Sequence, residues 1–293
     1  MPPASASVTL TSADNRNADQ IAYWNGPAGQ RWVRRQQEQD ALLAPVAEVL
    51  LDRAAPRAGE VALDIGCGWG GTAIALARRV APGGRVLGVD VSELMLARAR
   101  ELAPPGLPLE FRLGDATLYP FEPGKADLLV SRFGVMFFAD PARSFANMRK
   151  GLRTGARVVF ACWREPSENP WLMLPLQAAY SHVPRLPEVG PEDPGAFSFA
   201  AESRVRDILG CAGFSGIRLE PVGLTLDLAI GAGIEAAVAT AVGIGPTSRA
   251  LEGQPEPLQA AAIRSIRAAL GKHVAGNRVP LAGAIWIVTA VNP

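Results

Sequence analysis

The feature that most constrains the fold is a regular alternation of short apolar segments and amphipathic segments between residues 61 and 163. The apolar segments have strand length, and turn residues such as those of the run Ala81-Pro-Gly-Gly84 divide them from their neighbours. The expected strands are 61–65, 85–89, 109–113, 126–131 and 156–163, and the expected helices are 72–80, 92–102 and 141–152. Strands that alternate with helices form a parallel sheet with helices on both faces. The sequence therefore predicts a doubly wound α/β fold.

The pattern is less regular on either side of this block. Residues 1–18 are rich in Ser, Ala, Thr and Pro, which predicts a disordered tail. Residues 19–56 have helical spacing of apolar residues, clearest over 41–54. Later segments are expected as a Pro-rich insertion at 164–199, a helix at 201–212, strands at 217–228 and 284–291, and a mostly helical segment at 231–279.

Composition narrows the possible partners and compartment. Lys plus Arg number 29 and Asp plus Glu 28, so the chain lacks the basic surplus that phosphate binding favours, and we expect no nucleic-acid partner. Three cysteines far apart in sequence do not suggest a disulfide framework. The N-terminal residues lack the pattern of a signal peptide, and residues 223–245 are too polar and glycine-broken to cross a membrane. We therefore expect a cytoplasmic protein without membrane insertion.

A glycine-rich loop follows the first expected strand, in the run Val61-Ala-Leu-Asp-Ile-Gly-Cys-Gly-Trp-Gly-Gly71. Glycines at such a turn allow a tight bend and a close approach of backbone to ligand. The run fits two patterns: G-x-G-x-x-G, which is typical of dinucleotide binding, and D-x-G-x-G-x-G, which begins at Asp64. The glycine spacing alone does not decide between them.

Charge favours the second pattern. A dinucleotide places its pyrophosphate at the helix N-terminus, where the carboxylate of Asp64 would repel it. S-adenosylmethionine (SAM) has no phosphate, and it carries an ammonium group and a cationic sulfur. A carboxylate beside the loop suits that ligand better.

Two further acids lie at strand ends. Asp90 ends the second strand, where a carboxylate can accept hydrogen bonds from ribose hydroxyls, and Asp115 follows the third, where it can accept one from an adenine amino group. Each acid could instead cap a helix or start a turn. All three at successive strand ends favour an adenosine-type ligand at this edge of the sheet.

These residues carry a family resemblance. The segments LDIGCGWG (63–70), GVDVSELMLARAR (88–100), GDA (114–116), DLLVSRFGVMFFADP (127–141) and RVVFACW (157–163) resemble the class I SAM-dependent methyltransferases, especially the ubiquinone and menaquinone biosynthesis branch. The resemblance implies a seven-stranded, mostly parallel sheet whose last strand is antiparallel. It also implies cofactor contacts from Asp64, Gly66, Cys67, Gly68, Gly70, Asp90, Val91, Gly114, Asp115, Ala116, Ser131 and Trp24.

The resemblance also implies one domain over residues 19–293, with a helical cap at 19–56, a SAM-binding core at 57–163, and insertions at 164–199 and 231–279 that cover the substrate. The acceptor pocket is expected at Phe133, Met136, Phe137 and Phe138, although such a cluster can also be ordinary core. Nucleic-acid amino methyltransferases carry an Asp or Asn-Pro-Pro-aromatic motif after the fourth strand, and here it is replaced by Ser131-Arg132-Phe133-Gly134.

The candidates for catalysis are His182, Ser131 and Tyr23. His182 could act as a base from the insertion, Ser131 could touch the acceptor, and Tyr23, like Trp24, could either shield the sulfonium by a cation–π contact or attach the N-terminal helices to the sheet. No metal site is expected, since no His/Cys cluster has ligand spacing.

The expected function is SAM-dependent methylation of a small, apolar or aromatic molecule at an O, N or C atom by direct in-line displacement. Three alternatives stay open: an NAD-dependent oxidoreductase, a non-catalytic SAM-binding module, and a SAM-fold enzyme with non-methyl chemistry. The expected assembly is a monomer or a homodimer.

Overall fold

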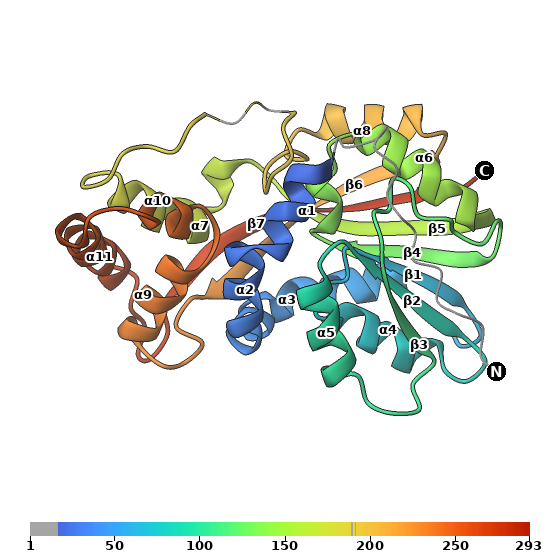
Figure 1. Ribbon diagram of the computed structural model, residues 1–293, viewed down its shortest axis with the longest axis horizontal. Coiled ribbons are helices and arrows are strands. Elements are labelled where there is room, and N and C mark those ends of the chain that lie inside the picture. Colours follow the sequence, from blue (N-terminus) through green and yellow to red (C-terminus); the bar gives the residue numbers. More distant parts are fainter. Residues whose placement is uncertain (1–16, 189, 191) are drawn as a thin grey trace.

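The computed structural model describes residues 17–188, 190 and 192–293, and its centre is a seven-stranded sheet in the order β3-β2-β1-β4-β5-β7-β6 (Figure 1). Neighbouring strands from β3 to β5 pair in parallel, whereas β7 runs antiparallel to both β5 and β6. The strands are β1 Val61–Ile65, β2 Arg85–Asp90, β3 Leu109–Leu113, β4 Ala126–Arg132, β5 Leu152–Trp163, β6 Ser215–Asp227 and β7 Pro280–Val291. The expected doubly wound sheet with one reversed strand is confirmed.

Helices cover both faces of this sheet (Figure 1). One face carries α3 (Gln36–Ala54), α4 (Gly71–Val80) and α5 (Glu93–Leu102), and the other carries α6 (Pro141–Gly151) and α8 (Glu202–Cys211). Because helices cover both faces, the central strands are apolar on both: Leu128, Leu129 and Val130 of β4 have no exposed surface.

A second group of helices lies beyond one end of the antiparallel strands β6 and β7, at the left of Figure 1. It consists of α7 (Pro170–Ala179), α9 (Ile234–Gly243), α10 (Gly245–Leu251) and α11 (Glu256–Gly271), and α7 packs against the other three. The helix α7 lies inside the expected Pro-rich insertion, with Pro170 in its first turn, where proline costs no hydrogen bond. Two short 3-10 turns, η2 (Gly134–Phe137) and η3 (Pro166–Glu168), follow β4 and β5.

The N-terminal helices α1 (Ala18–Asn25) and α2 (Pro27–Arg34) lie between the sheet and this second group (Figure 1). The expected tail through residue 18 is wrong at its boundary. Residues 1–16 lie outside the described part of the chain, but Asn17 is buried and Ala18 begins α1.

The order of the strands places a crevice at one edge of the sheet. β1 pairs with β2 on one side and with β4 on the other, so successive strands are added in opposite directions from β1. In open α/β sheets, ligands bind at this point, outside the carboxyl ends of the strands. The glycine loop follows β1, and the three expected acids Asp64, Asp90 and Asp115 lie at or just after the carboxyl ends of β1, β2 and β3.

Candidate functional site

A cavity of about 1430 Å³ lies at the carboxyl ends of the strands, enclosed by the N-terminal helices, α7 and α10. Small-molecule sites usually have roughly 300–1,000 Å³. The cavity is therefore large enough for a nucleoside-type cofactor together with a second molecule.

The glycine loop forms part of the floor. Gly66 and Gly68 line the cavity, and both have positive φ angles, 65° and 54°, which favour glycine. A Cβ atom on Gly66 would lie 2.7 Å from the Cα atom of Gly134, whereas one on Gly68 would meet no protein atom closer than 3.6 Å. The open side of Gly68 thus leaves room for a ligand against the backbone.

Gly70 does not lie at the cavity, so its expected cofactor contact is wrong. It has a φ angle of 83° at the start of α4, and a Cβ atom there would lie 2.6 Å from the ring of Phe111. The glycine is required by the turn and by close packing on β3.

Asp64 is the least exposed acid at the cavity, with 1% of its surface accessible. Its Oδ2 atom has no hydrogen-bond partner among the described residues. Burial raises the pKa of Asp64 to about 7; the nearby guanidinium of Arg132 opposes this rise and the carboxylate of Asp90 adds to it. The Ala73 amide donates to this carboxylate, but Oδ2 stays without a donor. An incompletely satisfied buried carboxylate is costly, so this position favours a ligand that brings N–H donors and positive charge.

Asp90 lies beside the loop at the end of β2. Its Oδ2 atom accepts a hydrogen bond from the Gly68 amide at 2.8 Å, and its Oδ1 atom accepts one from the Ser92 amide at 2.8 Å. Burial raises its pKa and these amides lower it. Each oxygen keeps a further lone pair, and Asp90, Val91 and Cys67 all line the cavity. Burial raises the pKa of the Cys67 thiol well above its usual range, so the thiol stays neutral.

Asp115 lies just after β3 and lines the cavity together with Gly114 and Ala116. Its carboxylate accepts hydrogen bonds from the Thr117 amide at 2.8 Å and from the side-chain amide of Asn17 at 2.7 Å. The structure thus brings the three strand-end acids to one cavity, as the sequence predicted from their positions.

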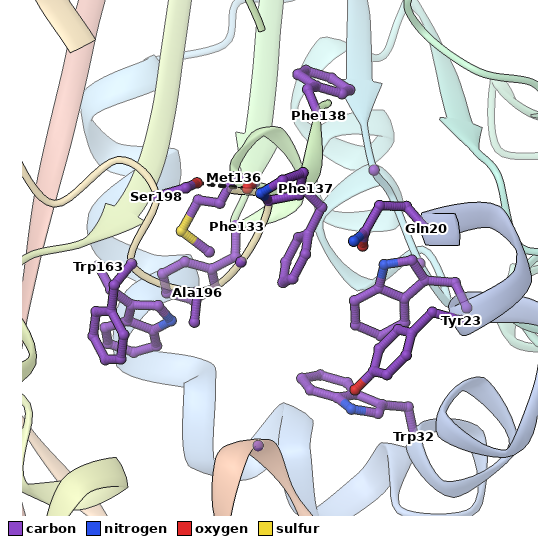
Figure 2. A pocket seen from close by; sticks show the side chains of 18 of the residues that line it. Gln20, Tyr23, Trp32, Phe133, Met136, Phe137, Phe138, Trp163, Ala196 and Ser198 are labelled. Carbon is purple, nitrogen blue, oxygen red and sulfur yellow. Dashed lines mark hydrogen bonds between the residues drawn. The ribbon is translucent and has the colours of Figure 1, made fainter. Parts of the chain in front are cut away.

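Aromatic side chains enclose the rest of the cavity (Figure 2). Figure 2 shows Phe137, Tyr23 and Trp32 on one side of the space and Trp163, Met136 and Ala196 on the other. Of the six tryptophans, five line the cavity: Trp24, Trp32, Trp69, Trp163 and Trp171. The four residues expected in the acceptor pocket, Phe133, Met136, Phe137 and Phe138, all line it.

Phe133 has an unusual backbone. Its φ angle is 69°, in the left-handed region that non-glycine residues rarely adopt, and its ring stacks on Trp163 with centroids 4.3 Å apart. Strain of this kind costs roughly 1–3 kcal/mol and is commonly found at binding sites. The left-handed backbone of Phe133 turns the chain sharply after β4, and Met136, Phe137 and Phe138 then line the cavity.

Arg132 connects the floor of the cavity to the helical cap. Its Nη2 atom lies 3.6 Å from the Oδ1 atom of Asp40 on α3, and that oxygen also accepts a hydrogen bond at 2.7 Å from the indole of Trp69 in the glycine loop. No sequence pattern singles out Asp40, because Trp69 and Arg132 are 29 and 92 residues away from it.

Two of the three catalytic candidates are wrong in position. Ser131 is fully buried, does not line the cavity, and donates a hydrogen bond at 2.7 Å to the carbonyl of Ile65, which ties β4 to β1; this also excludes its expected cofactor contact. His182 lies outside the cavity lining and pairs with the Ser265 hydroxyl of α11 at 2.7 Å. Sequence reasoning had no signal for either partner, because both are distant along the chain.

Tyr23 and Trp24 both line the cavity. Burial raises the pKa of Tyr23, and Arg249 opposes that rise, so its hydroxyl is protonated at neutral pH and can donate a hydrogen bond. The rings of Tyr23 and Trp24 form an edge-to-face pair with centroids 5.1 Å apart, and Trp24 makes a second such pair with Phe137.

Within residues 17–188, 190 and 192–293, no cluster of His, Cys, Asp or Glu could hold a metal ion. In the same residues no helix has the length and apolar character to cross a membrane.

Comparison with known proteins gives a consistent result. A methyltransferase domain family matches residues 62–155. Nocamycin O-methyltransferase from Saccharothrix syringae is 35% identical over 184 residues, which cover 59% of this chain and 66% of that protein. Demethylmenaquinone methyltransferase from Staphylococcus aureus is 36% identical over 103 residues, covering 35% and 43%. The chain thus spans about two fifths to two thirds of the length of these relatives.

The fold is also similar to that of solved structures. The YcgJ protein from Bacillus subtilis superposes with a TM-score of 0.56 and 14% identity over 85% of this chain and 98% of its own. At this identity the likeness concerns the fold alone. The matched region, residues 62–155, holds all three strand-end acids of the cavity.

Proposed function

We propose that this chain, which belongs to the class I SAM-dependent methyltransferase family, methylates a small apolar or aromatic molecule. The observation that carries the proposal is a single cavity with two kinds of lining. Three buried carboxylates line one region, and aromatic and apolar side chains line much of the rest, together with charged groups such as Arg204 and Arg249. The first region suits a cationic nucleoside, and the second suits an apolar partner placed against it.

The residues of the first region fit SAM. The unpartnered Oδ2 atom of Asp64 would accept a hydrogen bond from the ammonium group, whose charge offsets the cost of burying the carboxylate. Asp90 would hold the ribose hydroxyls through its free lone pairs, and Asp115 the adenine amino group. When bound, SAM supplies a methyl group on a positively charged sulfur, which an acceptor displaces in line from roughly 3 Å.

The same geometry disfavours an NAD-dependent oxidoreductase. A pyrophosphate would bind at the N-terminus of α4, beside the buried carboxyl of Asp64. Bringing an anion there would raise the cost of ionising Asp64 further.

The aromatic region would bind the acceptor and exclude water. Tyr23 is the catalytic candidate that lines the cavity, and its protonated hydroxyl would orient the acceptor by donating a hydrogen bond. The relatives are named for nocamycin O-methylation and for demethylmenaquinone methylation, which supports a small-molecule acceptor for this chain as well. We also propose a cytoplasmic location, with which the three free thiols are compatible.

A screen that uses the tryptophans tests the acceptor class. Five tryptophans line the cavity, so a bound aromatic molecule should quench the intrinsic fluorescence. Hydroxylated naphthalenes are expected to quench the emission and to yield S-adenosylhomocysteine (SAH) when SAM is added. Turnover with a short oligonucleotide but with no aromatic hydroxyl or amine would contradict the proposal.

A further inference from the structure

Two asparagines attach the ends of helix α1 to the cofactor loops. None of the residues of α1 is buried, so the apolar core does little to hold it. At its last residue, the side chain of Asn25 donates to the Val91 carbonyl at 2.9 Å and accepts from the Glu93 amide at 3.0 Å. Asn17, which directly precedes the first residue of α1, makes similar hydrogen bonds to the loops after β3 and β4. The two asparagines thus fasten the helix that presents Tyr23 and Trp24 to the cavity.

Asn17 makes three hydrogen bonds from a position that is 7% exposed. Its Nδ2 atom donates to the Oδ2 atom of Asp115 at 2.7 Å and to the Oγ1 atom of Thr117 at 3.0 Å, and its Oδ1 atom accepts from the Ala139 amide at 2.8 Å. The Ala139 amide can only donate and the carboxylate of Asp115 accepts, so the orientation of the Asn17 amide is determined.

The hydroxyl groups of Thr117 and Ser144 and the Thr117 amide also donate hydrogen bonds next to Asn17 and Asp115. Thr117 accepts from Asn17, so its own hydroxyl proton goes to Ser144, at 2.7 Å, and Ser144 donates to the Asp140 carbonyl at 2.8 Å. The Thr117 amide binds the second oxygen of Asp115. Both oxygens of Asp115 therefore receive an N–H from the protein, which fixes the plane of the carboxylate and the directions of its remaining lone pairs.

We propose that Asn17 is a positioning residue that fixes the orientation of the Asp115 carboxylate and thereby favours adenine over hypoxanthine in the cofactor. An adenine ring carries a 6-amino donor, which suits two fixed acceptor oxygens. A hypoxanthine ring carries a 6-carbonyl oxygen, which such oxygens repel. The inference rests on the proposed SAM function.

The test compares two ligands that differ in the base at position 6 and at N1. SAH carries a 6-amino donor and an N1 acceptor, whereas S-inosylhomocysteine carries a 6-carbonyl oxygen and an N1–H donor. Both are titrated calorimetrically into the purified protein. The wild-type protein should prefer SAH. In Asn17→Ala, Asp115 loses one donor and its fixed orientation. The preference for SAH should then fall by roughly tenfold or more, the effect of one hydrogen bond to a charged group.

Asn25→Ala is the matched control. It removes the same side chain from the other end of the same helix, but Asn25 contacts the loop after β2 and not Asp115. A mere loosening of α1 would weaken both ligands to a similar extent in both variants. We expect Asn25→Ala to leave the ratio of the two affinities unchanged and only Asn17→Ala to lower it.

The outcomes separate the possible failures. A ratio that is unchanged in Asn17→Ala, or that falls equally in Asn25→Ala, overturns the role of Asn17. A wild-type protein that binds neither ligand contradicts the proposed function itself. If Asn17→Ala does not fold, Asn17→Ser, which keeps a polar group near Ala139, is measured with the same ratio as readout.

Discussion

Asp64 offers a prediction that links stability to cofactor binding. Its carboxyl is 1% exposed, its Oδ2 atom has no partner among the described residues, and burial raises its pKa to about 7. An acid whose pKa is higher in the folded state favours folding most at low pH. Its contribution is lost as pH rises from the unfolded pKa, near 3.8, to the folded one, near 7. The neutral amide in Asp64→Asn cannot ionise, so it escapes this loss.

The size of the effect follows from the two pKa values. Between pH 5 and pH 8 the wild-type protein should lose about 2–3 kcal/mol of stability through this group, at 1.36 kcal/mol for each unit of pKa difference. The variant should lose none through it. Relative to the wild type, Asp64→Asn should therefore gain about 2–3 kcal/mol between these pH values, or very roughly 4–10 °C in Tm.

The assay is thermal and denaturant unfolding of both proteins at pH 5, 6, 7 and 8, with and without SAH. Taking the difference between the proteins removes the contributions of titrating groups that do not interact with Asp64. SAH should stabilise the wild type more than the variant at pH 8, because its ammonium group pairs with the ionised carboxylate. A difference between the two proteins that does not change with pH, or that changes in the opposite direction, would refute the reasoning.

Three other substitutions test separate parts of the site. Asp90→Ala should lower SAM affinity at least a hundredfold in a calorimetric titration, since two hydrogen bonds to a charged group are worth roughly 1.5–3 kcal/mol each; unchanged affinity contradicts the ribose contact. Gly68→Val is strained at a φ of 54°, although no protein atom lies within 3.4 Å of its Cβ, so we expect lower stability. The folded fraction should not bind SAH, and normal binding would show that the ligand does not approach this backbone. His182→Ala should leave SAM affinity and the pH profile of kcat unchanged, because His182 faces Ser265 outside the cavity; a large fall in kcat would restore it as a base.

The parts of the fold and site that sequence predicts are those that depend on local pattern. The alternation of strands and helices fixes a parallel sheet, and the carboxyl ends of parallel strands meet at one edge. Asp64, Asp90 and Asp115 therefore share one cavity, although 51 residues separate the first from the last. The aromatic run from Phe133 to Phe138 follows the fourth strand end and reaches the same space.

The parts that sequence misses depend on contacts between distant residues. Ser131 and Arg132 are neighbours at a strand end, but the alternation of side chains along a strand turns Ser131 into the sheet and Arg132 to the cavity. The sequence suggests that His182 is free to act as a base, because its hydrogen-bond partner Ser265 on α11 is 83 residues away. Asn17 lies in a segment whose composition resembles a tail, and its value comes from Asp115, 98 residues further on.

The most direct test of the central claim is a calorimetric titration of the purified protein with SAM and SAH, with NADH as the control. We expect micromolar binding of both SAM and SAH and no binding of NADH. Binding of NADH without binding of SAM would contradict the role given to the buried carboxyl of Asp64 and would move the cavity to oxidoreductase chemistry.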